Sequence, residues 1–276
     1  MIDALARALA SRARLLDVHS DEDHNRSVFT VVGDDTALVD ALLAGIAAAR
    51  ERIDLRRHEG VHPRIGAADV VPVVPIRRDD MERARAVALA LARRIGDELG
   101  LPVFLYAEVG EGRGPAFFRR GGVAGLQTRI DDGELRPDFG PATLDASAGG
   151  VIVGARRPLI AFNVNLAGAS VEVAREIAGV IRERGGGFYG VRALGLDLPR
   201  AGKAQVSMNV EDWEASALHE IVGAIEREAQ ARGVEIESSE LVGLMPAGAA
   251  AAAAGSALRI EGFDSSRLLE LRLLQD

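Results

Sequence analysis

The chain has 276 residues, of which 48% are hydrophobic, and its formal net charge is -8. A chain of this length and composition can bury a sizeable core in one or two globular domains. The negative charge argues against a nucleic-acid partner, which normally meets a basic surface, and no apolar run approaches the roughly 20 residues that cross a membrane. Cysteine is absent, which excludes disulfides, thiolate metal sites and cysteine nucleophiles.

The opening segment indicates a cytoplasmic location. Residues 1–18, MIDALARALASRARLLDV, place arginines inside an amphipathic pattern, whereas a secretory signal has a basic tip followed by a continuous apolar stretch. We therefore expect a cytoplasmic chain with no membrane partner.

Apolar spacing predicts a series of helices and strands over the first part of the chain. The stretch from Gly110 to Gly150 is rich in glycine and gives no clear pattern, so we assign it no element. The elements expected before it are helix Ile2 to Ala10, strands Arg14 to Val18 and Ser27 to Val32, helix Thr36 to Arg52, strand Val70 to Val74, helix Asp80 to Leu99 and strand Leu101 to Tyr106.

The second half has the order β-α-β-β-α-β, which is the split βαβ or ferredoxin-like unit, a four-stranded sheet with two helices on one face. Glycines 185–187 are expected to end its first helix. The predicted elements are strand Leu159 to Leu166, helix Ser170 to Arg184, strands Val191 to Leu196 and Ala204 to Val210, helix Trp213 to Arg232, strand Val234 to Glu237 and a further helix Ala249 to Ala254.

The first half lacks one strand when it is compared with the second. A unit of this topology opens with a strand, yet the chain opens with a helix at Ile2. Because the opening strand lies inside the sheet, its absence predicts a gap or an edge that something else must cover. An uncovered edge also makes a homodimer plausible.

The sequence His58-Glu59-x-x-His62 has the spacing of the zinc-protease signature. That signature requires an α-helix, on which both imidazoles share one face, but Gly60 and Pro63 disfavour a helix here. No further histidine follows until His219. We therefore expect an irregular loop and no metal site.

Polar side chains alternate along two strands of the second half. Asn163 and Asn165 lie in LIAFNVNL, and Gln205, Ser207 and Asn209 lie in AQVSMNV. With a period of two, each set points to one face of the sheet. Such a face either meets water or binds a ligand through amide hydrogen bonds, and these residues alone leave both interpretations open.

Histidine is the side chain best suited to carry a proton near neutral pH. His62 precedes a Val-rich strand and lies beside Arg64, whose charge would disfavour the imidazolium and so suit a base. For His19, His24 and His219 a structural role is the simpler interpretation.

Seven segments, taken in order, resemble the formiminotransferase domain family, which includes the N-terminal half of formiminotransferase-cyclodeaminase. Together they extend over nearly the whole chain and are far more specific than any single motif. The resemblance implies an α+β fold of two ferredoxin-like subdomains, residues 1–157 and 158–276, with a folate site between them and without the family's opening strand in the first. The segments are LLDVHSDEDHNRSVFTVVG, RRHEGVHPRIGAADVVPVVPI, LPVFLYAE, RPDFGPATLDASAGGVIVGAR, LIAFNVNL, KAQVSMN and SSELVGLMP.

The resemblance also implies an activity. Members of this family transfer the formimino group from N-formimino-L-glutamate to N5 of tetrahydrofolate, giving 5-formimidoyltetrahydrofolate and glutamate, in histidine degradation. Tetrahydrofolate is thus the acceptor substrate, and no metal is implied. The family's catalytic histidine corresponds to His62, which would take the proton of the attacking folate nitrogen or return a proton to the departing glutamate nitrogen.

The family's folate-binding stretch and the carboxylates of glutamate suggest further site residues. Arginine forks match carboxylates, so Arg26, Arg64 and Arg156, with Asn163 and Asn165, are candidates for holding the two glutamate carboxylates. The folate-binding stretch corresponds to Gly140, Pro141, Ala142, Thr143, Leu144, Asp145, Ala146, Ser147, Ala148 and Gly149.

Three departures from the family pattern leave alternatives to this activity. The family's opening strand is absent, His19 stands where an acidic residue is usual, and Ala148 stands where an aromatic residue is usual. One alternative is a 5-formyltetrahydrofolate/glutamate formyltransferase. The other is a catalytically impaired relative that binds folate.

Overall fold

The computed structural model of the chain describes residues 1–273. The chain forms two compact units, Met1–Arg157 (unit 1) and Pro158–Asp276 (unit 2). Among the helices in the described residues, none is both long enough and apolar enough to cross a membrane.

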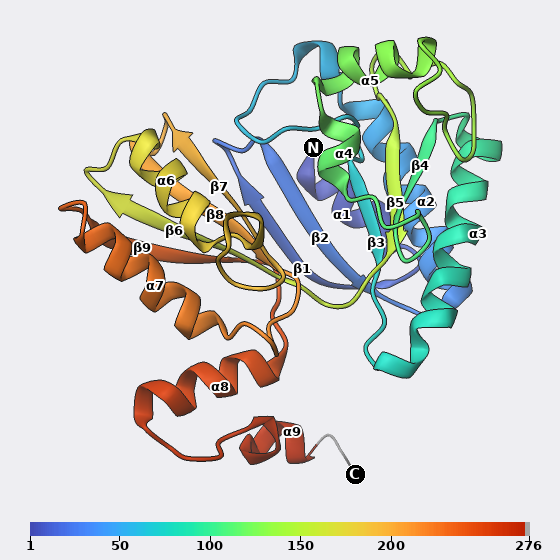
Figure 1. Cartoon of the computed structure of the whole chain (residues 1–276). Coiled ribbons are helices and arrows are strands. Elements are labelled where there is room, and N and C mark those ends of the chain that lie inside the picture. Colours follow the sequence, from blue (N-terminus) through green and yellow to red (C-terminus); the bar gives the residue numbers. More distant parts are fainter. Residues whose placement is uncertain (274–276) are drawn as a thin grey trace. The chain divides into compact units, whose positions relative to one another are not determined.

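Unit 1 begins with a helix and an antiparallel β-hairpin (Figure 1). The second helix starts where Asp34 accepts a hydrogen bond from Ala37 N over 2.9 Å, a typical N-cap. The elements are α1 (Ile2–Ala10), β1 (Arg14–Asp21), β2 (Arg26–Val32), α2 (Asp35–Arg52) and the 3-10 turn η1 (Leu55–Arg57).

A parallel three-stranded sheet of order β3-β5-β4 forms the centre of unit 1. Helices α2 and α3 pack on one of its faces, through residues such as Ile46 and Leu91. Helices α4 and α5 cover the other face, where Phe118 and Leu126 meet Phe104. The elements are β3 (Val70–Val73), η2 (Arg78–Asp80), α3 (Met81–Leu99), β4 (Val103–Ala107), α4 (Pro115–Arg119), α5 (Gly122–Asp131) and β5 (Val151–Ala155).

Unit 2 contains the predicted ferredoxin-like sheet, in the order β7-β8-β6-β9 with every neighbouring pair antiparallel. Val164 and Leu166 of the sheet pack against Ile177 and Ile221 of its two helices. The elements are β6 (Ile160–Ala167), α6 (Val171–Ile181), η3 (Glu183–Gly185), β7 (Val191–Leu198), β8 (Lys203–Val210), α7 (Leu218–Gln230), β9 (Glu235–Val242), α8 (Ala247–Leu258), η4 (Ser265–Arg267) and α9 (Leu269–Leu273).

The predicted gap in the sheet of unit 1 is present. Within residues 1–273, β2 pairs only with β1 and β3 only with β5, so the strands form two sheets instead of one. In unit 2 the opening strand, β6, lies between β8 and β9.

Several predicted elements need correction. The strand β5 received no assignment, and the glycine-rich stretch before it contains α4 and α5. Helix α6 ends at Ile181, before the three glycines, because Arg182 is extended and forms a bridge with Phe188. Helix α7 starts at Leu218 instead of Trp213.

Candidate functional site

His62 lies in an irregular loop between η1 and β3. His58 and His62 therefore do not share the face of an α-helix, as the zinc-protease signature would require. Across the part of the chain that the structure describes, no group of three or more His, Asp or Glu side chains could hold a metal ion. We call residues 58–69 the His62 loop.

Arg64 fastens this loop to the turn of the β1–β2 hairpin. Its guanidinium donates to the carbonyl of His62 over 2.9 and 3.1 Å, and to the carbonyls of His24 and Asn25 over 3.1 and 3.2 Å. It also contacts Nδ1 of His58. The Arg64 side chain is thus engaged by the protein itself.

Three side chains from elsewhere in unit 1 surround the imidazole of His62. Arg26, the first residue of β2, donates from Nη1 to His62 Nε2 over 2.9 Å. The ring of His24, in the hairpin turn, lies edge-on with its centroid 6.1 Å away. Arg119, at the end of α4, adds a second positive charge. Because a guanidinium only donates, Nε2 must accept, and the imidazole is neutral with its proton on Nδ1.

The pKa of His62 is lowered from 6.5 to about 3. Burial is the largest cause, followed by the charges of Arg26, Arg119 and His24. The direction agrees with the prediction that arginine disfavours the imidazolium, but the charges responsible come from distant parts of the sequence. The pKa of His58 is also lowered, by burial and then by the charge of Arg64.

One carboxylate connects the His62 loop to Arg119. Asp69 Oδ1 accepts from the backbone N–H groups of Ile65 and Gly66 over 2.7 and 3.2 Å. Asp69 Oδ2 accepts from Arg119 Nε over 3.0 Å and also from its Nη2. The position of Arg119 beside His62 and the path of the loop after His62 therefore depend on the same side chain.

The far end of segment 140–149 lies against the His62 loop. Ala67 N donates to Ala148 O over 2.9 Å, and Gly150 N donates to Ile65 O over 3.0 Å. The structure thus brings together two parts of the sequence that the family resemblance singled out separately. Both belong to unit 1.

Individual residues of segment 140–149 differ in what they contact. A Cβ at Gly149 would lie 2.0 Å from Ile65 O, and φ there is +70°, so this glycine permits close approach to the chain's own carbonyl. Ala148 is only 3% exposed and packs in the core, and Leu144 is likewise buried. The exposed members are Gly140, Pro141, Ala142, Thr143 and Ala146.

The remaining predicted residues lie apart from this loop in the sequence and make other contacts. Arg156 follows β5, and its Nη1 donates to the carbonyl of Arg157 over 2.9 Å. Asn163 and Asn165 are on β6 of unit 2, where they donate to Glu240 over 2.9 Å and to Ser238 over 3.0 Å respectively.

The polar face of the unit 2 sheet is hydrogen-bonded across its strands. Gln205 Nε2 donates to Asn165 Oδ1 over 3.0 Å. Gln205 is 1% exposed and Asn163 is 3% exposed, so these two side chains are buried rather than hydrated.

Two family models match the chain in its two halves. The model described as the formiminotransferase domain, N-terminal subdomain, matches residues 1–156, and the formiminotransferase domain matches residues 161–262. The chain belongs to the formiminotransferase family. Both the His62 loop and segment 140–149 fall within the first of these matches.

Curated members of the formiminotransferase family are similar over most of the chain. A glutamate formimidoyltransferase of Streptococcus pyogenes serotype M1 is 40% identical over 264 residues, 94% of this chain and 88% of the relative. One of Thermoplasma acidophilum is 38% identical over 284 residues, 99% of this chain and 92% of the relative. The formimidoyltransferase-cyclodeaminase of Sus scrofa is 40% identical over 258 residues, 89% of this chain but 47% of the relative.

The sequence of this formiminotransferase family member did not identify three side chains of the site around His62. His24 was assigned a structural role, Arg119 lies in the stretch that received no element, and Asp69 was not considered. Arg119 follows two phenylalanines in FFRR and Asp69 precedes a strand, but neither pattern signals a charged partner for a distant histidine.

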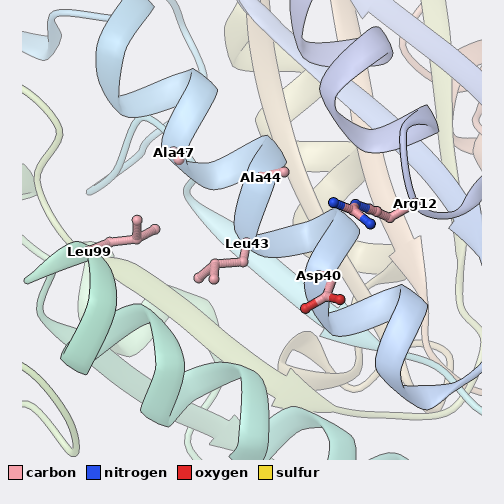
Figure 2. Close-up of a pocket in the computed structure, with 6 residues that line it drawn as sticks. All are labelled: Arg12, Asp40, Leu43, Ala44, Ala47 and Leu99. Atoms are coloured by element: carbon pink, nitrogen blue, oxygen red, sulfur yellow. The ribbon is translucent and has the colours of Figure 1, made fainter.

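A surface hollow elsewhere in unit 1 has different chemistry. Figure 2 shows it between α2 and the end of α3, with Leu43 and Leu99 on its walls and Arg12 and Asp40 at one side. Asp40 is paired with Arg94 over 2.5 Å. No histidine lines this hollow, so the His62 loop is the candidate site in this formiminotransferase family member.

The pKa of His62 predicts how acid affects stability. Because its pKa falls from 6.5 to about 3 on folding, the unfolded chain binds a proton between these values that the folded chain excludes, and stability falls as the pH drops through 6.5. We expect His62→Gln to lose less thermal stability than the unmodified chain between pH 6.5 and 4.5, measured by circular dichroism. Parallel melting-temperature curves for the two proteins would contradict the burial of a neutral imidazole.

Proposed function

We propose that this chain is a glutamate formimidoyltransferase that acts in histidine degradation. It transfers the formimino group from N-formimino-L-glutamate to N5 of tetrahydrofolate, giving 5-formimidoyltetrahydrofolate and glutamate. The proposal is supported by family membership and by two curated relatives of this name that the chain matches over 88% and 92% of their lengths. The observation that supports a particular site for this activity is the neutral imidazole of His62, which accepts a hydrogen bond from Arg26 and lies in a loop that is hydrogen-bonded to segment 140–149.

In the proposed mechanism His62 carries a proton between two nitrogens. N5 of tetrahydrofolate attacks the formimino carbon, a C–N bond forms, and His62 Nε2 takes the N5 proton. The bond between that carbon and the glutamate nitrogen then breaks. The imidazolium returns the proton to the departing nitrogen, so protons balance over the cycle and the neutral imidazole that starts it is regenerated.

The same proposal assigns the binding of both substrates. Tetrahydrofolate binds at segment 140–149 and the carboxylates of formiminoglutamate bind to Arg26, with Arg64, Arg156, Asn163 and Asn165 as further candidates. No resident metal or other cofactor is part of the proposal.

The test is a transfer assay on the purified chain. N-formimino-L-glutamate and tetrahydrofolate are supplied together, and formation of 5-formimidoyltetrahydrofolate is followed by absorbance, with 5-formyltetrahydrofolate plus glutamate in a parallel reaction. We expect turnover with the formimino donor. Turnover with the formyl donor alone would replace the proposal with formyl transfer, and folate binding without either reaction would indicate the impaired relative.

We also propose that the chain forms a homodimer through its open strand edges. Strands β2 and β3 each have one edge without a strand partner in the described residues, and unpaired edges invite pairing with another chain. Light scattering of the purified protein tests this. A monomer at all concentrations would contradict it.

A further inference from the structure

The three arginines near His62 differ in how firmly the protein holds them. Arg64 donates to three backbone carbonyls and contacts one imidazole, and Arg119 is paired with a carboxylate, that of Asp69. Arg26 is exposed, and the one hydrogen bond of its guanidinium within residues 1–273 is to His62 Nε2, over 2.9 Å. Arg26 can therefore move at the cost of a single contact.

That single contact blocks the nitrogen that the proposed mechanism needs. A general base must present its lone pair to the proton it removes. In the free chain the Nε2 lone pair of His62 accepts from Arg26, and the other ring nitrogen carries the proton of the neutral imidazole. Neither nitrogen of this imidazole is then available as a base.

We propose that Arg26 guards His62 in the free chain and that a carboxylate of the bound substrate draws its guanidinium away, which frees Nε2 to accept a proton. The inference rests on the proposed function, in which the donor carries two carboxylates. A carboxylate accepts two parallel hydrogen bonds from an arginine fork and is a stronger acceptor than a neutral imidazole. The guanidinium stays protonated throughout, and the proton that reaches Nε2 comes from the attacking nitrogen.

The charges around His62 make the same exchange change its basicity. Arg26 faces the ring from β2, Arg119 from α4 and His24 from the hairpin turn. Two carboxylates lie farther out, Asp69 against Arg119 and Asp21 toward Arg26. When the protonated Arg26 guanidinium moves away and pairs with a substrate carboxylate, Arg119 and His24 stay in place but the positive charge that touches the ring is removed. The pKa of His62 therefore rises when substrate is bound.

The experiment is an NMR titration of the His62 ring in the unmodified chain, with and without L-glutamate as the probe, and with His62→Gln to identify its signals. We expect L-glutamate to raise the pKa of His62 by about one unit or more. In Arg26→Gln the pKa should already be raised without glutamate, and glutamate should add little to it. Arg26→Lys, which keeps the charge but not the fork, should respond less than the unmodified chain.

A matched control and a parallel assay separate the possible failures. Arg83, on α3, forms an exposed ion pair with Asp35, on α2. Arg83→Gln removes the same charge far from the ring in sequence, and His62 should titrate in this variant as it does in the unmodified chain. An unchanged His62 titration at glutamate concentrations up to its solubility overturns the proposal, as does an equal shift in Arg26→Gln. Formimino transfer is assayed in parallel. If L-glutamate raises the pKa of His62 but no transfer occurs, the proposed function is contradicted and the role of Arg26 is not. If transfer occurs but L-glutamate leaves the pKa of His62 unchanged, the proposed role of Arg26 is contradicted and the function is not.

Discussion

Replacing His62 by glutamine is expected to lower the turnover of formimino transfer by about 10²- to 10⁴-fold, the usual contribution of a positioned acid or base. The glutamine Oε1 can still accept from Arg26 in place of Nε2, so the local hydrogen bonding and the fold are retained. An amide does not take up a proton under these conditions, so the variant lacks only the proposed proton transfer. The measurement is kcat and KM with both substrates.

The interpretation of the His62→Gln result depends on whether kcat or KM changes. A loss confined to kcat supports proton transfer, because groups that act only in the transition state leave binding unchanged. His219→Gln, a histidine on α7 with no proposed role in the reaction, is the matched control and should keep the activity of the unmodified chain. If His62→Gln remains fully active while folded, His62 takes no part in the reaction.

The elements that the sequence predicts well are those whose bounds are set by residues within or next to the element itself. Helix α1 has the bounds that apolar spacing gives, and α2 and α3 each begin within one residue of the expected position. Strand β5 was missed because every residue of Val151–Ala155 is buried, so it shows no alternation, and it includes a glycine. A strand in the middle of a parallel sheet is specified by its neighbours, and those neighbours are far away in sequence.

The same distinction applies to the site. The lone His-Pro-Arg segment predicts an irregular loop, because Pro63 and Gly60 act on the local backbone. What surrounds His62 is not local: Arg26 lies 36 residues away along the chain, and Asp69 and Arg119 are 50 residues apart. Arg64 is only two residues from His62 in sequence, yet its guanidinium points to the hairpin turn and to His58. Proximity in sequence therefore identified the wrong arginine as the main charge on the imidazole.

Replacing Asp69 by alanine is expected to lower the free energy of unfolding by roughly 2–4 kcal/mol, because it leaves two backbone donors and a guanidinium without their acceptor. Asp69 accepts from the N–H groups of Ile65 and Gly66 and from two nitrogens of Arg119, Nε and Nη2. Its loss also frees the His62 loop to move, and displacement of a reacting group by about 1 Å costs on the order of 10²-fold in rate. Urea unfolding and kcat measure the two effects.

The variant Asp69→Asn separates the effect of the hydrogen bonds to the His62 loop from the effect of the negative charge beside Arg119. An asparagine oxygen can still accept from Ile65 and Gly66, but it carries no charge opposite Arg119. We therefore expect this variant to recover much of the stability and kcat lost in Asp69→Ala, and the pKa of His62 to fall further, because the positive charge of Arg119 is no longer balanced. If alanine and asparagine have the same kcat, the hydrogen bonds to the loop do not position His62. If Asp69→Ala is as stable as the unmodified chain, this carboxylate does not hold the site together.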